Sequence, residues 1–126
     1  LKFPGGGLEL GEGVIEGLQR EFYEETSLQI LDYQHYYTTD FFQQSYFNPE
    51  DQIISLYYLV HCTEDEEVSP LEQDEEFLGF EWRPLGALNP EDLPLPIDQH
   101  VAENLVEEHA LGLTHENLWG EGEIPV

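Results

Sequence analysis

The run of residues 52–62 constrains the fold of this chain more than any other segment. It reads Gln-Ile-Ile-Ser-Leu-Tyr-Tyr-Leu-Val-His-Cys, so it is almost continuously apolar and rich in aromatic and β-branched residues. That composition predicts a β-strand, and the continuous apolarity predicts that both faces of the strand are buried. The sequence therefore predicts a strand without a solvent-facing side.

The remaining elements follow from hydrophobic periodicity and from turn residues. Apolar residues spaced three and four apart predict a helix over residues 12–26. Asp98 is a suitable N-cap for a second helix, which we expect from residue 99 to about residue 111. Further extended segments are predicted at residues 1–3, 8–11, 28–42 and 77–83.

This order of elements predicts an α/β fold with a mixed β-sheet. The sequence shows neither an internal repeat nor an interdomain linker, so we expect residues 1–126 to form a single domain. Because Leu1 begins as if within a strand, we also expect one or more strands to precede it.

The charge of the chain excludes several partners. With 28 acidic and 3 basic residues, the formal net charge is −25, and binding to a nucleic-acid duplex would need a basic patch. The same charge opposes docking on an anionic membrane, and no apolar run is long enough to span one. The excess of carboxylates favours a halophilic protein whose fold depends on charge screening. The single cysteine, Cys62, fits a reducing, cytoplasmic compartment.

Three glutamates of the predicted 12–26 helix break two local rules. Glu21, Glu24 and Glu25 lie at positions i, i+3 and i+4, so they share one helix face and repel one another. Glu24 and Glu25 also stand in the last turn, where the helix macrodipole favours cations. A divalent cation would relieve both conflicts, because carboxylates and carbonyls are the ligands that Mg²⁺, Mn²⁺ and Ca²⁺ prefer. In a chain with 28 acids, the same arrangement also arises readily by chance.

The spacing around these glutamates resembles a known motif. Gly6 is followed after five residues by Glu12, and after seven more by Arg20-Glu21-Phe22-Tyr23-Glu24-Glu25-Thr26-Ser27-Leu28. This segment is similar to the Nudix box, Gly-x5-Glu-x7-Arg-Glu-apolar-x-Glu-Glu-x-Gly-apolar. Ser27 is the one departure, because the family has a glycine there, just after the helix, where a left-handed conformation is typical. We expect the serine to lower stability rather than to change the chemistry.

The resemblance implies a Nudix-like α/β/α sandwich around a mixed β-sheet. It also implies an enzyme that hydrolyses a nucleoside diphosphate linked to another group, with Mg²⁺ as cofactor and Mn²⁺ as an alternative. Arg20 would orient the glutamates, Glu12 would hold the loop and helix together, and the metal ligands would be the Gly5 carbonyl, Glu21, Glu24 and Glu25. The partner would be a small-molecule nucleotide, which reaches an acidic protein through the metal charge. The oligomeric state stays open, with a homodimer as one possibility.

A further glutamate is expected in the loop before the 77–83 strand. Glu76 is the first candidate for a general base or an additional metal ligand, and Glu75 is the second; a solvated loop acid is the alternative. Six aromatic residues near one strand and loop either stack on a nucleobase or pack in the core: Tyr36, Tyr37, Phe41, Phe42, Tyr46 and Phe47.

Two other functions are compatible with this chain. A non-catalytic Nudix-fold sensor would bind a nucleotide and regulate a partner, but such sensors usually lose the box glutamates, and all of them are present here. In an acidic interaction domain, the glutamates would be only halophilic surface, and metal binding would be diffuse and weak. The intact motif favours the metal-dependent pyrophosphohydrolase.

Overall fold

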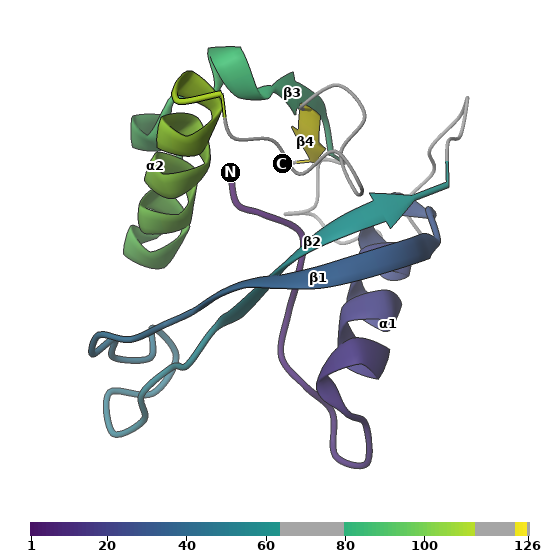
Figure 1. The fold of residues 1–126 in the computed structure, drawn as a ribbon. Coiled ribbons are helices and arrows are strands. Elements are labelled where there is room, and N and C mark those ends of the chain that lie inside the picture. Colours follow the sequence, from purple (N-terminus) through teal and green to yellow (C-terminus); the bar gives the residue numbers. More distant parts are fainter. Residues whose placement is uncertain (64–79, 113–122, 126) are drawn as a thin grey trace.

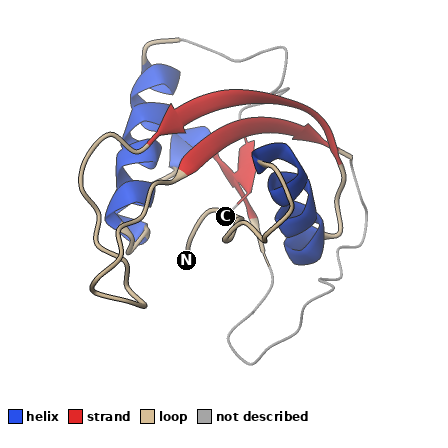
Figure 2. Cartoon of the chain, turned by 90° about the horizontal axis from the view of Figure 1, so that it is seen from below, coloured by secondary structure: helices blue, strands red, loops and turns tan. Residues whose placement is uncertain are grey.

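Two helices and a long β-hairpin make up most of the structure. The computed structural model describes residues 1–63, 80–112 and 123–125. Its elements are, in chain order, α1 (Val14–Thr26), β1 (Ile30–Thr38), β2 (Leu56–Cys62), β3 (Trp82–Pro84), the 3₁₀ turns η1 (Leu85–Ala87) and η2 (Pro90–Asp92), α2 (Pro96–Ala110) and β4 (Glu123–Pro125). Figure 1 shows α1 and α2 on opposite sides of the β1–β2 hairpin, and Figure 2 shows the hairpin arching between the two helices. The fold is therefore α/β in kind.

The strands form two antiparallel pairs. β1 pairs with β2 from Ile30 opposite Cys62 to Thr38 opposite Leu56, and two register shifts interrupt this ladder. β3 pairs with β4. Because both pairs within the described ranges are antiparallel, the parallel pairing that a mixed sheet requires is not seen there.

The expectation that the 52–62 strand is buried on both faces is wrong. β2 begins only at Leu56, which is 43% exposed, and Leu59 is its one buried residue. The prediction overestimated the burial of this strand because it counted Tyr57 and Tyr58 as core residues. A tyrosine can bury its ring and still keep its hydroxyl in a polar environment, so a half-buried position suits it.

The core lies between β2 and α2. Its buried side chains come from β2, from the 3₁₀ turns and the loops after them, and from one face of α2: Leu59, Leu85, Leu88, Leu93, Val101, Ala102 and Leu105. Phe22 and Leu28 are buried as well, at α1 and just after it. Among the described residues, α1 and α2 included, no helix has the length and apolarity needed to cross a membrane.

Asp98 does not cap α2, contrary to the sequence prediction. The helix begins at Pro96, whose fixed φ suits a first turn, and its N-cap is Leu95. Asp98 is 5% exposed, and its carboxylate accepts a hydrogen bond of 2.6 Å from the hydroxyl of Tyr57 on β2. Burial raises the pKa of the Asp98 carboxyl. The residue that suggested a cap therefore links α2 to the hairpin.

The N-terminal segment also differs from its prediction. Residues 1–3 and 8–11 were expected to be extended segments but adopt no strand structure. Phe3 instead packs edge-on against Tyr57, with 6.1 Å between the ring centroids. The strand predicted at residues 77–83 falls largely outside the described residues, and β3 begins at Trp82.

Replacing Tyr57 with Phe should lower the free energy of unfolding by about 1–3 kcal/mol, because a buried carboxylate loses a hydrogen-bond donor. Burial and the neighbouring Asp98 also raise the pKa of Tyr57. Its contribution is therefore complete below the usual tyrosine pKa near 10 and is lost as the pH rises above that value. Denaturant titration from pH 7 to 11 measures both effects. Tyr46→Phe, at a residue 59% exposed, is the control, and equal losses in the two variants would contradict the role of Tyr57.

Candidate carboxylate site on α1

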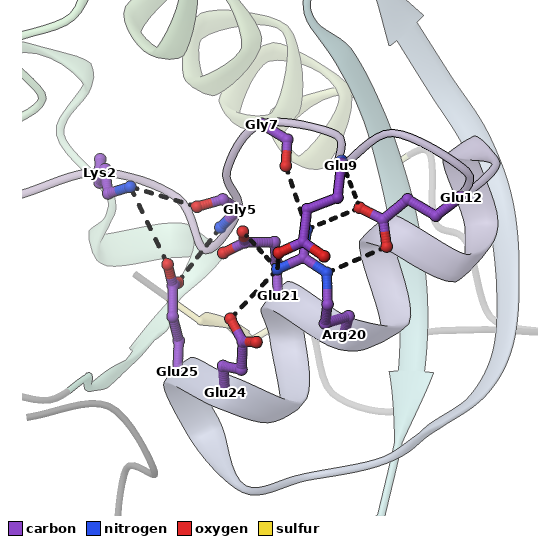
Figure 3. Close-up of polar contacts among 9 residues, drawn as sticks. All are labelled: Lys2, Gly5, Gly7, Glu9, Glu12, Arg20, Glu21, Glu24 and Glu25. Atoms are coloured by element: carbon purple, nitrogen blue, oxygen red, sulfur yellow. Dashed lines mark hydrogen bonds and ion pairs between the residues drawn. The ribbon is translucent and has the colours of Figure 1, made fainter.

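The glycine loop before α1 lies directly against the glutamates of the helix. The backbone N–H of Gly5 donates to Oε2 of Glu25 over 3.2 Å. A Cβ atom added to Gly6 would come within 2.5 Å of the Glu21 carboxyl carbon, so any larger residue here would push the Glu21 carboxylate out of its present position. Two of the three α1 glutamates predicted as ligands, Glu21 and Glu25, thus face the loop that carries the Gly5 carbonyl (Figure 3).

Arg20 connects the carboxylates with each other and with the loop. Its guanidinium donates to both oxygens of Glu12, over 3.0 Å from Nε and 2.7 Å from Nη2. Nη1 donates to Glu21 over 2.9 Å and to Glu24 over 3.3 Å. Nη2 also donates to the carbonyl of Gly7 over 3.1 Å. A planar guanidinium can make these contacts at once, whereas a lysine ammonium has no such fork.

Glu12 fastens the start of α1 to the loop. Besides the bidentate pair with Arg20, its Oε1 accepts the backbone N–H of Glu9 over 2.8 Å. The hydrogen bonds from Arg20, followed by the one from Glu9, lower the pKa of Glu12 to about 2. This stabilisation is therefore present above the usual glutamate pKa and is lost as the pH falls towards 2.

Sequence reasoning missed two residues at this site, Lys2 and Glu9, and the Glu9 carboxylate lies 3.6 Å from Nη1 of Arg20. The ammonium of Lys2 donates to the Gly5 carbonyl over 3.3 Å and lies 4.0 Å from Oε1 of Glu25. The sequence could have indicated Lys2 as a site residue, because it is one of only three Lys and Arg residues and stands just before the glycine loop.

The side chains offer oxygen donors that suit a hard divalent cation. Those of Glu21, Glu24 and Glu25 are only 17%, 27% and 13% exposed, so bulk solvent screens them less than the surface acids. Within residues 1–63, 80–112 and 123–125, no three carboxyl, imidazole or thiol groups are arranged to hold a metal ion. Instead, Arg20 contacts Glu21 and Glu24, and Lys2 contacts Glu25.

The other predicted site residues are placed only in part. Glu75 and Glu76 lie outside the described residues. Of the six aromatic residues, Tyr36 and Tyr37 pack against the core. The other four are 40% to 97% exposed: Phe41, Phe42, Tyr46 and Phe47. They belong to the end of the hairpin, which lies away from α1 in both views (Figures 1 and 2).

α1 ends in the backbone conformation expected where the motif has glycine. Ser27 has φ 62° and ψ 12°, which is left-handed, and its N–H donates to the carbonyl of Tyr23 over 2.8 Å. A residue with a Cβ atom is strained in this region.

Ser27→Gly should raise the free energy of unfolding by about 1 kcal/mol, because glycine removes the left-handed strain at the helix end. Denaturant titration of the variant and of the original chain measures the difference. Ser55→Gly is the control at a residue without positive φ, and it should be neutral or destabilising. A loss of stability in Ser27→Gly would contradict the claim that the left-handed conformation of Ser27 is strained.

Comparison with known families agrees with the motif. A family model described as NUDIX domain matches residues 1–105. Neither the comparison with curated proteins nor that with solved structures gives a match. The family match begins at the segment before the glycine loop and extends through most of α2, so it includes the glycine loop, α1 and the β1–β2 hairpin. The chain belongs to the Nudix family, whose members hydrolyse nucleoside diphosphates linked to another group.

Proposed function

We propose that this chain is a pyrophosphohydrolase of a nucleoside triphosphate or a related nucleotide, and that it depends on Mg²⁺ or Mn²⁺. The observation that supports this most directly is the packing of the glycine loop against Glu21 and Glu25, while Arg20 holds Glu21 and Glu24. We also propose that residues 1–126 form one Nudix-like α/β/α sandwich and that the protein works in a cytoplasm rich in salt.

Four groups would hold the metal: the Gly5 carbonyl and the carboxylates of Glu21, Glu24 and Glu25. When bound, the ion would neutralise the pyrophosphate charge and lower the pKa of a coordinated water. All four donors now contact a cationic side chain, so a divalent ion would compete with Lys2 and Arg20 for them.

Arg20 would keep the glutamates oriented during that exchange. Arg20 donates to Glu12 from Nε and Nη2, whereas only its Nη1 donates to Glu21 and Glu24. The Glu12 pair can therefore persist while the contacts of Nη1 loosen. Glu76 is our candidate for the general base or an additional ligand, with Glu75 as the second choice.

Glu24→Gln and Glu25→Gln should each lower turnover by about a thousandfold, because an amide oxygen binds a divalent cation far more weakly than a carboxylate does. The assay offers nucleoside triphosphates, damaged nucleotides, dinucleoside polyphosphates and nucleotide sugars with MgCl₂, and measures released phosphate or pyrophosphate. Glu103→Gln, at an exposed residue of α2, is the matched control.

Near-original turnover in either variant would contradict the ligand assignment. Absence of hydrolysis across the whole panel by the original chain would contradict the proposed activity itself. Far-UV circular dichroism and denaturant titration check that each variant keeps its fold.

The glycine loop provides a second, geometric test. Gly6→Ala should weaken Mg²⁺ binding and lower turnover, because its Cβ would displace the Glu21 carboxylate. Gly7→Ala is the matched control next in sequence, since its Cβ would meet nothing within 4 Å. Calorimetric titration with MgCl₂ compares the two variants, and equal affinities would show that the close approach at Gly6 has no role in the site.

A further inference from the structure

Lys2 lies against the glutamate face of α1, which is the face that carries Glu21, Glu24 and Glu25 (Figure 3). Its ammonium donates to the Gly5 carbonyl over 3.3 Å and lies 4.0 Å from Oε1 of Glu25. The other oxygen of that carboxylate accepts the backbone N–H of Gly5 over 3.2 Å. Lys2 therefore contacts two of the groups that we propose as metal ligands.

Lys2 has the loosest ion pair among the Lys and Arg side chains. The sequence has three of these residues. Arg20 is 22% exposed and hydrogen bonds three carboxylates, the closest over 2.7 Å. Arg83 is 28% exposed and pairs with Glu81 over 2.6 Å and with Asp92 over 3.4 Å. Because Lys2 is 55% exposed and its contacts are longer, its ammonium is the easiest of the three cations to release.

The backbone on either side of Lys2 is held, so a released ammonium stays close to the site. Phe3 packs edge-on against Tyr57, with 6.1 Å between the ring centroids, and against the core. Further along the chain, the N–H of Gly5 is bonded to Glu25. The flexible four-carbon stem of lysine can turn about this base, whereas several hydrogen bonds fix the planar guanidinium of Arg20.

A nucleotide at this site would need a cation besides the metal. A divalent ion on the Gly5 carbonyl and Glu25 would repel an ammonium that contacts the same oxygens, because like charges only a few ångströms apart repel strongly. The phosphate chain would keep negative charge on its other oxygens, and a lysine ammonium is a common partner of phosphate. In a chain with a net charge of −25, Lys2 is the nearest loosely paired cation that can take this place.

We propose that Lys2 is a phosphate-binding residue of the carboxylate site: it leaves the Gly5 carbonyl and Glu25 when a divalent ion binds there, and its ammonium then pairs with the phosphate chain of the nucleotide. This inference rests on the proposed function and extends it, because Lys2 lies outside the motif from Gly6 to Leu28. It gives Lys2 two opposite effects, since the side chain opposes the metal and favours the phosphate.

Lys2→Met tests both effects, because methionine keeps an unbranched apolar stem and removes the charge. Calorimetric titration with MgCl₂ alone should give a Kd about threefold lower than that of the original chain, as expected when one exposed competing ion pair is lost. Titration with methylenediphosphonate in saturating MgCl₂ should give a Kd about tenfold higher, as expected when a charge-assisted hydrogen bond to phosphate is lost. This pyrophosphate analogue has no oxygen bridge to hydrolyse, so the measurement does not depend on turnover.

Two control variants separate the role of Lys2 from that of net charge. Lys2→Arg keeps the positive charge and should restore both Kd values towards those of the original chain. Arg83→Met changes the net charge by the same amount as Lys2→Met, but on β3, so both of its shifts should be smaller. Denaturant titration checks that each variant keeps its fold.

Weaker binding of both Mg²⁺ and the diphosphonate in Lys2→Met would mean that Lys2 only holds the loop in place, and would overturn the proposal. Shifts of equal size in Lys2→Met and Arg83→Met would overturn it too, because net charge alone would explain them.

The outcomes also distinguish this proposal from the proposed function. If the two opposite shifts appear but the original chain hydrolyses no nucleotide of the panel, the role of Lys2 stands and the proposed activity fails. If the original chain hydrolyses a nucleotide but Lys2→Met changes neither Kd, the activity stands and the role of Lys2 fails. Absence of Mg²⁺ binding by the original chain would overturn both.

Discussion

The contact of Arg20 with surrounding carboxylates is the interaction on which the described site depends. The chain has only three basic residues, and two of them, Arg20 and Lys2, contact the glutamate face of α1. The third, Arg83, pairs with Glu81 and Asp92 elsewhere. Without Arg20, the like charges on successive turns of α1 would repel one another and the loop would lose its link to the helix.

Local spacing predicted what is local in this fold. The 3.6-residue period predicted α1 and put its three glutamates on one face of the helix. The motif, which has glycine after the helix, indicated that Ser27 would be left-handed. Long-range contacts were not predictable in this way. The side chain of Asp98 looked like a cap because its residue type favours caps, but burial beside Tyr57 gave it another partner. Lys2 meets Glu25 only because the loop folds back onto the helix, and no spacing rule encodes that return.

β2 shows that the hydrophobicity of a segment does not by itself predict its burial. An apolar run reports that a segment can be buried, whereas actual burial depends on which layers cover it. Here the buried core gathers where α2 and the 3₁₀ turns meet Leu59, and the exposed Leu56 lies at the end of the ladder near the hairpin loop. The motif from Gly6 to Leu28, by contrast, needs no knowledge of layers, because its spacing is read along the chain.

Coverage, rather than charge, distinguishes the carboxylates of the site from the rest of this acidic surface. Glu25 is 13% exposed, whereas Glu81, which lies away from α1, is 57% exposed. Salt screens charges that are surrounded by water far more than charges that are partly covered by protein. In concentrated salt, the general negative field of the chain would therefore fade while the field of the covered glutamates persists. A chain with a net charge of −25 could in this way admit a polyanionic nucleotide and still hold a divalent cation at one place.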